Sequence, residues 1–404
     1  MPHTKSLLRV RSEGGSAKGE VKSVELFFDL VFVFAITQLS HLLIVHLSLE
    51  GALQTGLLLV AVWWVWIFTS WVTNWLDPDT IPVRLLLFAL MLAGLVLSAS
   101  IPAAFETRAL PFAIAYVLMQ VGRSLFILWA LRNENPSSFQ NFQRISLWFA
   151  FSAVLWIAGA FLEPSARLAV WSLAMLIEFI SPSVGFWVPR LGRSATEDWD
   201  VSGDHMAERC GLFVIIALGE SLLVTGNTWT ELPWSAVTIT AFAVAVVASI
   251  AMWWIYFHVG AERARRVIEH SRDPGRWARL AYTYIHILLI AGIILGAVSD
   301  EIILKHPTDP ADTASIAILI GGPALFLLGN VWFKWATVGR PPLSHLLGLG
   351  LLAALVPAAI ALPNLAVAAA AAFALIFVAA WEARSLASAR NRIQPHIDVV
   401  ENAG

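Results

Sequence analysis

The chain has 404 residues, of which 58% are hydrophobic and only 13% are charged. Soluble domains carry roughly 25% charged residues, so this composition excludes a water-exposed globular protein and indicates a membrane protein. The net charge of −2 excludes nucleic acid as a partner, and the single cysteine, Cys210, excludes a disulfide and a multi-cysteine metal site.

Apolar runs long enough to cross a bilayer recur along the whole chain. A bilayer core of roughly 30 Å takes about 20 apolar residues per helix. The last run, 343–381, would be about 60 Å long as one helix, so it must fold back near Pro363. We therefore predict an all-α polytopic transmembrane helix bundle of about twelve spans, at 24–45, 52–74, 81–104, 109–131, 144–162, 166–188, 205–226, 234–258, 277–299, 313–335, 342–361 and 364–382.

The basic residues give these spans an orientation, because cytoplasmic loops retain Lys and Arg. With the N-terminus inside, inward segments hold 22 of the 26 Lys and Arg residues, and outward loops hold Arg108, Arg167 and Lys305. Both termini are therefore predicted to be cytoplasmic. The tail 1–23 has no apolar core and is not a cleaved signal peptide. The predicted cytoplasmic segments are the tails 1–23 and 383–404 and the linker 189–204.

Four sequence features of the first part of the chain recur in the same order in the second part, which predicts an internal duplication into halves 24–188 and 205–382. Six spans per half is an even number, so the halves would be parallel, related by an axis along the membrane normal. The alternative is twelve unrelated apolar helices with coincidental matches. The matches are Glu25 with Glu208 at the helix starts, Trp63-Trp64-Val65-Trp66 with Trp253-Trp254-Ile255-Tyr256, Asp77-Pro78 with Asp273-Pro274, and Gly122-Arg123 with Gly329-Asn330.

Ionisable side chains inside the spans are the first functional candidates, because they are costly there and usually face a partner or a pathway. Glu220 lies about 18 Å along its helix from Glu208, beyond the midplane, where it could exchange a proton. The alternative for Glu220 is a protonated carboxyl that only hydrogen-bonds to a neighbouring helix. The candidates for a pathway or for proton binding are Glu220, Glu25, Asp29, Glu208, Thr37 and His41.

Intramembrane cations give a second set of candidates, for ion pairs or a gate. Asp29 and Arg123 lie at matching depths from the cytoplasmic side, which predicts an Asp29–Arg123 ion pair. Arg209 and Lys334 occupy the corresponding region of the second half. Such pairs can also serve only to lock helices together. Glu178 is a further intramembrane acid, and the sequence indicates no partner for it.

Histidines and tryptophans are the remaining side chains that could bind a ligand. No His-Glu-x-x-His or paired Cys/His spacing occurs, so we predict no metal and no cofactor. Trp63, Trp64 and Trp71 in the second predicted helix are candidates for lining a cavity that takes an apolar or cationic ligand. The alternative is membrane-interface belts and helix packing.

Two stretches carry a family resemblance. Val24-Glu-Leu-Phe-Phe-Asp-Leu-Val-Phe-Val-Phe-Ala-Ile-Thr-Gln-Leu-Ser-His41 and Glu208-Arg-Cys-Gly-Leu-Phe-Val-Ile-Ile-Ala-Leu-Gly-Glu-Ser221 resemble the bacterial low temperature requirement protein A family. The resemblance covers roughly 20–385. It implies a multipass protein of the bacterial inner membrane, linked by name to growth in the cold, and no established reaction.

These observations favour a transporter or channel for a small solute or ion, with proton coupling as an option and the pathway between the two halves. The alternative is a non-transporting membrane protein of cold or membrane-state adaptation, or a scaffold for partners. An intramembrane enzyme acting on lipid needs a cluster of nucleophile, base or metal ligands, and no such spacing occurs. We therefore expect no enzyme activity, and the lipid bilayer as the one defined partner.

Overall fold

The computed structural model describes residues 7–8, 21–194, 203–260 and 279–401. Within these residues every regular element is a helix, and β-pairing is limited to isolated bridges. The predicted all-α class is thus confirmed. The chain divides into two compact units, 1–217 with 268–287, and 218–267 with 288–404, which are described separately. Most of the predicted tail 1–23 and part of the predicted linker 189–204 lie outside the described residues.

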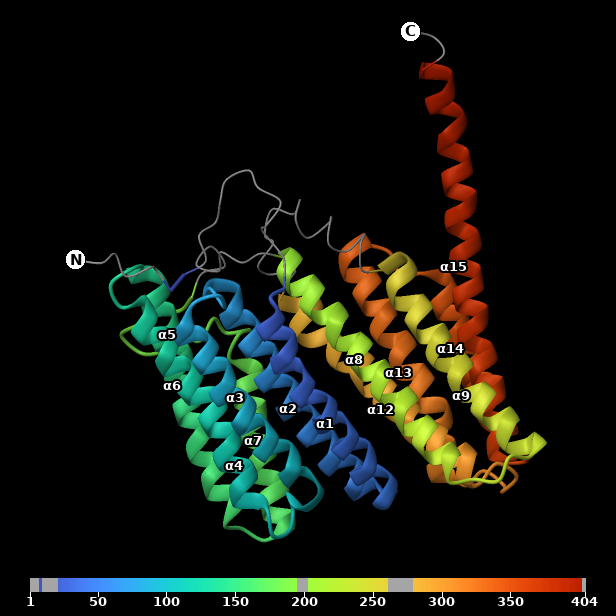
Figure 1. The fold of residues 1–404 in the computed structure, drawn as a ribbon, viewed down its shortest axis with the longest axis horizontal. Helices are drawn as coiled ribbons and strands as arrows, with labels where there is room; N and C mark the ends of the chain where they lie inside the picture. The colour runs from blue at the N-terminus through green and yellow to red at the C-terminus, as the bar shows by residue number, and fades with distance from the viewer. Residues whose placement is uncertain (1–6, 9–20, 195–202, 261–278, 402–404) are drawn as a thin grey trace. The chain divides into compact units, whose positions relative to one another are not determined.

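The first unit is a helical bundle in which α1, α2, α3, α4 and α6 run side by side (Figure 1). Its fourth helix is continuous from Ala109 to Leu131 but contains one π-helical turn. The elements are α1 Ser23–Val45, α2 Leu49–Trp75, α3 Ile81–Ser100, the 3-10 turn η1 Ile101–Ala103, α4 Ala109–Val117, the π turn η2 Leu118–Gly122, α5 Arg123–Leu131, α6 Pro136–Ala160, α7 Pro164–Ile180, the first part of α8 (Gly203–Thr230) and the π-helix η5 Arg279–Ile285.

The second unit is also helical. In it α15 packs against α9, α13 and α14. Its elements are the rest of α8, α9 Ala236–Ile255, the π turn η4 Tyr256–Gly260, most of α12 (His286–Lys305), α13 Thr313–Val338, α14 Leu343–Ala359 and α15 Asn364–Glu401.

Ten helices of the described chain are long and apolar enough to cross a membrane, judged by length and composition. This number of apolar helices establishes a multipass membrane protein. The predicted helices at 166–188 and 342–361 correspond to α7 and α14, which have 17 residues each. At 1.5 Å per residue each is about 25 Å long, short of a core of roughly 30 Å. The count of twelve spans and the duplication stay predictions.

Local capping explains where helix boundaries differ from the predicted ones. The helix predicted from 144 begins at Pro136, because Asn135 accepts a hydrogen bond from the Ser138 N–H at 3.1 Å and Pro136 suits a first helical turn. The helix predicted to reach 188 ends at Ile180, because Pro182 has no N–H to continue it. Turns follow, with Gly185 at φ 65°.

Candidate functional site

Four ionisable side chains with no exposed surface meet where α1 and the start of α8 come together. We call Glu25, Asp29, His205 and Arg209 the α1–α8 cluster. Arg209 donates from Nη2 to Asp29 Oδ1 at 2.6 Å and from Nη1 to Glu25 Oε1 at 3.2 Å. His205 Nε2 lies 2.9 Å from the same Glu25 oxygen. Trp66 of α2 also donates to Asp29 Oδ1, at 2.7 Å.

Helix periodicity builds this cluster from two short pairs. Glu25 and Asp29 are four residues apart on α1, and His205 and Arg209 are four apart on α8, so each pair shares one helix face. Asn74 of α2 has its amide nitrogen 3.3 Å from His205 Nδ1. An amide donor at Nδ1 places the imidazole proton on Nε2, which then donates to Glu25. In this tautomer the imidazole is neutral, and its Nε2–H holds the Glu25 carboxylate in place.

One carboxylate oxygen of the cluster has no hydrogen-bond donor among the described residues. Asp29 Oδ2 is buried and accepts no hydrogen bond from the described residues, and Arg209 Nε likewise donates none. Leaving a buried polar atom without a partner costs about 1–3 kcal/mol. Such atoms in native structures call for a water, an ion or a functional role. Asp29 Oδ2 is therefore the atom of the cluster best placed to take up a proton.

The predicted Asp29–Arg123 ion pair is wrong, because Asp29 pairs with Arg209 instead. Arg123 is buried against α2, where it donates to Val65 O at 3.1 Å and to Thr69 Oγ1 at 3.0 Å. Matching depth placed the two groups at the same level but could not fix the rotation of each helix about its axis.

Glu178 of α7 has the partners that the sequence could not indicate. Tyr116 and Gln120 donate to its Oε2 at 2.7 and 3.0 Å, and Ser152 and Trp156 donate to its Oε1 at 2.5 and 3.1 Å. Both carboxylate oxygens are therefore satisfied. Gln120, inside the π turn η2, also accepts a hydrogen bond from Arg123 and so links the cation to the acid.

Lys334, the ion-pair candidate of the second half, is buried in the second unit. Its Nζ donates to both oxygens of Glu382 on α15, at 2.6 and 2.8 Å, and lies 3.2 Å from His345 Nε2 on α14. Sequence reasoning missed His345 and Glu382. The one signal for Glu382 was its position as a charge at the end of the last apolar run.

The remaining polar candidates do not gather at one place. Glu220 is 6% exposed and lies in the part of α8 that belongs to the second unit. Glu208 and His41 are exposed on their helices. Thr37 is half-buried and donates to Val33 O in its own helix at 3.1 Å. Of the sequence candidates on α1, only Glu25 and Asp29 therefore belong to the cluster.

The candidate tryptophans of α2 are buried in side-chain packing. Trp63 donates to Thr283 O at 2.7 Å and Trp71 to Thr283 Oγ1 at 2.9 Å, which fastens η5 to α2. Trp63 also stacks on His286, and Trp64 packs against Phe179. In the described part of the chain, no group of three His, Cys, Asp or Glu residues could hold a metal ion.

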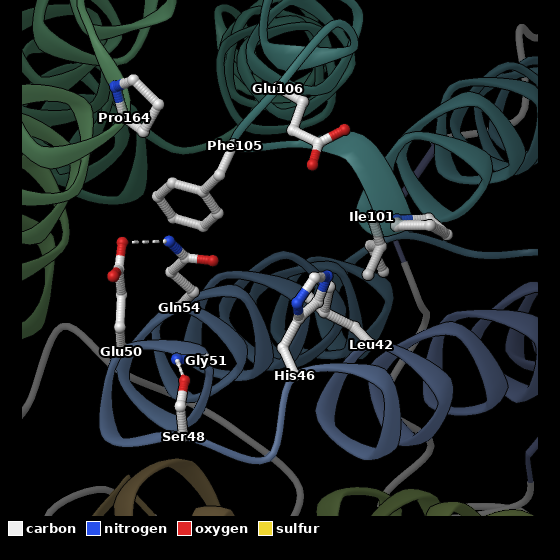
Figure 2. A pocket seen from close by; sticks show the side chains of 11 residues that line it. Leu42, His46, Ser48, Glu50, Gly51, Gln54, Ile101, Phe105, Glu106 and Pro164 are labelled. Carbon is white, nitrogen blue, oxygen red and sulfur yellow. Dashed lines mark hydrogen bonds between the residues drawn. The ribbon is translucent and has the colours of Figure 1, made fainter.

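A pocket of about 270 Å³ opens where the α1–α2 turn meets η1 (Figure 2). Figure 2 shows Glu50 joined to Gln54 by a hydrogen bond, with Phe105 beside them and His46 and Glu106 around the opening. The two carboxylates give this surface pocket an acidic lining.

Comparison with known proteins extends the resemblance of the two helix-opening stretches to most of the chain. The family model described as Bacterial low temperature requirement A protein (LtrA) matches residues 20–380. A protein of Rhizobium meliloti (strain 1021), named Uncharacterized protein RA0937, is 42% identical over 364 residues, which cover 89% of this chain and 88% of that protein. No solved structure gives a significant match to the chain.

Proposed function

The chain belongs to the bacterial low temperature requirement A protein family, and we propose that it is a proton-coupled transporter or channel for a small solute or ion. The proton would bind in the α1–α8 cluster. The observation that carries this proposal is Asp29 Oδ2, a fully buried carboxylate oxygen with no hydrogen-bond donor among the described residues.

The composition of the cluster supports proton binding over an ion pair that only holds the helices together. One acid and one base are enough for such an ion pair, whereas Arg209 here contacts two acids, Glu25 and Asp29. Buried ion pairs also contribute little to stability compared with apolar packing of the same volume. A proton-binding role gives these groups a reason to be buried together.

A proton on Asp29 would change how the two helices hold each other. Protonation removes the negative charge that faces Arg209 Nη2, and Arg209 then keeps its contact with Glu25. Breaking the Arg209–Asp29 pair weakens one of the links between α1 and α8. Coupling of a proton to a conformational change requires such a charge-dependent contact.

The proposal includes the finer topology: twelve spans, cytoplasmic termini, an inner-membrane location and a parallel duplication. A shared arrangement supports the duplication. In each predicted half a cation of the fourth helical segment is linked to an acid of the sixth. Arg123 reaches Glu178 through Gln120, and Lys334 contacts Glu382 directly.

The first test measures proton and solute movement in proteoliposomes that contain the purified protein and an internal pH dye. A panel of amino acids, sugars, polyamines and inorganic ions is added outside. We expect the wild type to couple the movement of at least one solute to internal pH, and Asp29→Asn to lower this flux at least about tenfold, a loss of about 1.4 kcal/mol of transition-state stabilisation. Glu134→Gln, an exposed acid between α5 and α6, is the matched control and should retain the wild-type flux.

Glu220→Gln is measured in the same assay, because Glu220 on α8 is a second buried candidate for proton binding. Full flux in Asp29→Asn would remove the α1–α8 cluster from the mechanism, and full flux in Glu220→Gln would remove Glu220. Wild-type vesicles that match empty liposomes for every solute would argue against transport.

The second candidate function is a non-transporting protein of cold or membrane-state adaptation, or a scaffold. The tight interior of the first unit favours it. In the most apolar stretch of α2, 89% of the residues are buried, and the tryptophans Trp63 and Trp71 pack against η5. The flux assay separates the candidates, because only the transporter moves solute.

A further inference from the structure

Asp300 on α12 is a buried acid that the proposed proton site does not use. It is 5% exposed and lies within a helix long and apolar enough to cross the membrane. Its Oδ2 accepts hydrogen bonds from Ser221 Oγ at 3.2 Å and from Thr225 Oγ1 at 3.0 Å. Ser221 and Thr225 are four residues apart on α8 and so face α12 together.

Asp300 differs from Asp29, Glu178 and Glu382 in how its charge is balanced. Asp29 contacts Arg209, Glu382 contacts Lys334, and Glu178 has four donors. The contacts of Asp300 among the described residues are the two hydroxyl groups alone. An isolated carboxylate inside the membrane is costly, so its stable form carries a bound positive charge.

The neighbouring ionisable groups do not supply that charge. On α12, Lys305 pairs with Glu301 at 2.6 Å. On α8, Glu220 precedes Ser221 and is itself an acid. Lys334, His345 and Glu382 of the second unit contact one another. His258 of η4 stacks on Trp254 of α9.

The atoms around Asp300 are those that a small hard cation prefers. The carboxylate and two hydroxyls are all oxygen ligands, and the Ser221 carbonyl oxygen lies 2.8 Å from Thr225 Oγ1. Thr225 has a single hydroxyl hydrogen but two acceptors within 3.0 Å, so one contact can be exchanged without loss of the other. With one carboxylate, a monovalent cation gives a neutral site, whereas a divalent ion leaves a surplus charge.

We propose that Asp300, Ser221 and Thr225 form a binding site for one monovalent cation, a proton or a sodium ion. This inference stands apart from the proposed transport, because binding is measured without flux. It also stands apart from the α1–α8 cluster, with which it shares no residue.

The test follows thermal unfolding of the purified full chain by tryptophan fluorescence. One arm compares sodium chloride with choline chloride at equal ionic strength, and the other varies pH from about 5 to about 8 in choline alone. A ligand that binds only the folded state raises the unfolding temperature with its concentration. We expect the wild type to respond to sodium if the cation is sodium, or to pH alone if it is a proton.

Variants test whether the change in unfolding temperature comes from the Asp300 site. Asp300→Asn should abolish it. Thr225→Val removes an oxygen ligand and should weaken the apparent affinity for sodium about tenfold. If the cation is a proton, the same variant removes a hydroxyl donor that stabilises the ionised carboxylate and should instead tighten proton binding. Glu301→Gln, the neighbouring acid paired with Lys305, is the control and should keep the wild-type response. Ser221→Ala gives a second reading if Asp300→Asn does not fold.

Two outcomes would overturn the proposal. One is a wild-type unfolding temperature that depends on neither sodium nor pH. The other is an apparent affinity that stays at the wild-type value in both Thr225→Val and Ser221→Ala, or a response of full size in a folded Asp300→Asn protein. A positive response combined with no flux in the liposome assay would support this site and contradict the proposed transport, so the two failures are distinguishable.

Discussion

Glu178 is held inside the membrane bundle without a direct cation. Its four donors come from α4, η2 and α6, so one side chain ties several segments of the first unit to α7. Arg123 acts on it only through Gln120. This arrangement satisfies both carboxylate oxygens and indicates a structural acid rather than one that exchanges protons.

Glu178→Gln should therefore destabilise the protein. The glutamine amide group has two hydrogens and would face donors that need an acceptor, which we expect to cost about 2–3 kcal/mol of unfolding free energy. Thermal unfolding of the purified protein, followed by tryptophan fluorescence, measures the loss. Glu134→Gln, an exposed acid, should leave the unfolding temperature unchanged. An unchanged unfolding temperature in Glu178→Gln would show that the network contributes little.

At the scale of the elements, α12 and α13 approach each other through glycine. A Cβ atom added at Gly292 would lie 2.7 Å from the Phe326 backbone nitrogen and 2.9 Å from Gly322 O. Both contacts are to backbone, which cannot move aside as a flexible side chain can. Small residues allow such close approach of membrane helices, where packing rather than hydrophobic burial drives association.

Gly292→Ala should push the two helices apart and lower the unfolding free energy by about 1–3 kcal/mol, the usual cost of overpacking. Gly321→Ala is the matched control, because a Cβ atom there meets nothing within 4 Å. The same unfolding assay compares the two variants. Equal stability of both would mean that the α12–α13 contact adapts without cost.

At the scale of the whole molecule, the number of spans depends on whether α7 and α14 cross the membrane. Cys210 is buried and is the single cysteine of the chain, so Cys210→Ala provides a background for labelling introduced cysteines. Glu163→Cys precedes α7 and Arg193→Cys follows it, and both positions are exposed.

In intact cells, a membrane-impermeant maleimide should label Glu163→Cys, and it should label Arg193→Cys only after the membrane is permeabilised. This result places the two ends of α7 on opposite sides, as twelve spans with a cytoplasmic N-terminus require. Labelling of both positions from the same side would mean that α7 does not cross, and the predicted orientation of the second half would then be reversed.

The sequence by itself determined the membrane class, the approximate positions of most helices and some of the ionisable residues inside them, such as Glu25, Asp29, Arg123 and Glu178. These properties depend on local composition, since a span needs only a sufficient run of apolar residues. It also identified the family, through stretches that contain Glu25, Asp29 and Arg209. Helix ends were less accurate, as Asn135 and Pro182 show, because caps depend on single residues.

Only the tertiary structure decided which charges meet. Depth along a helix can be counted from the sequence, but the partner of a side chain depends on helix rotation and on which helices are neighbours. Asp29 therefore pairs with Arg209 rather than Arg123, and Asp300 faces hydroxyl groups that lie 75 and 79 residues away in the chain. The α1–α8 cluster and the Asp300 site therefore result from how the helices pack.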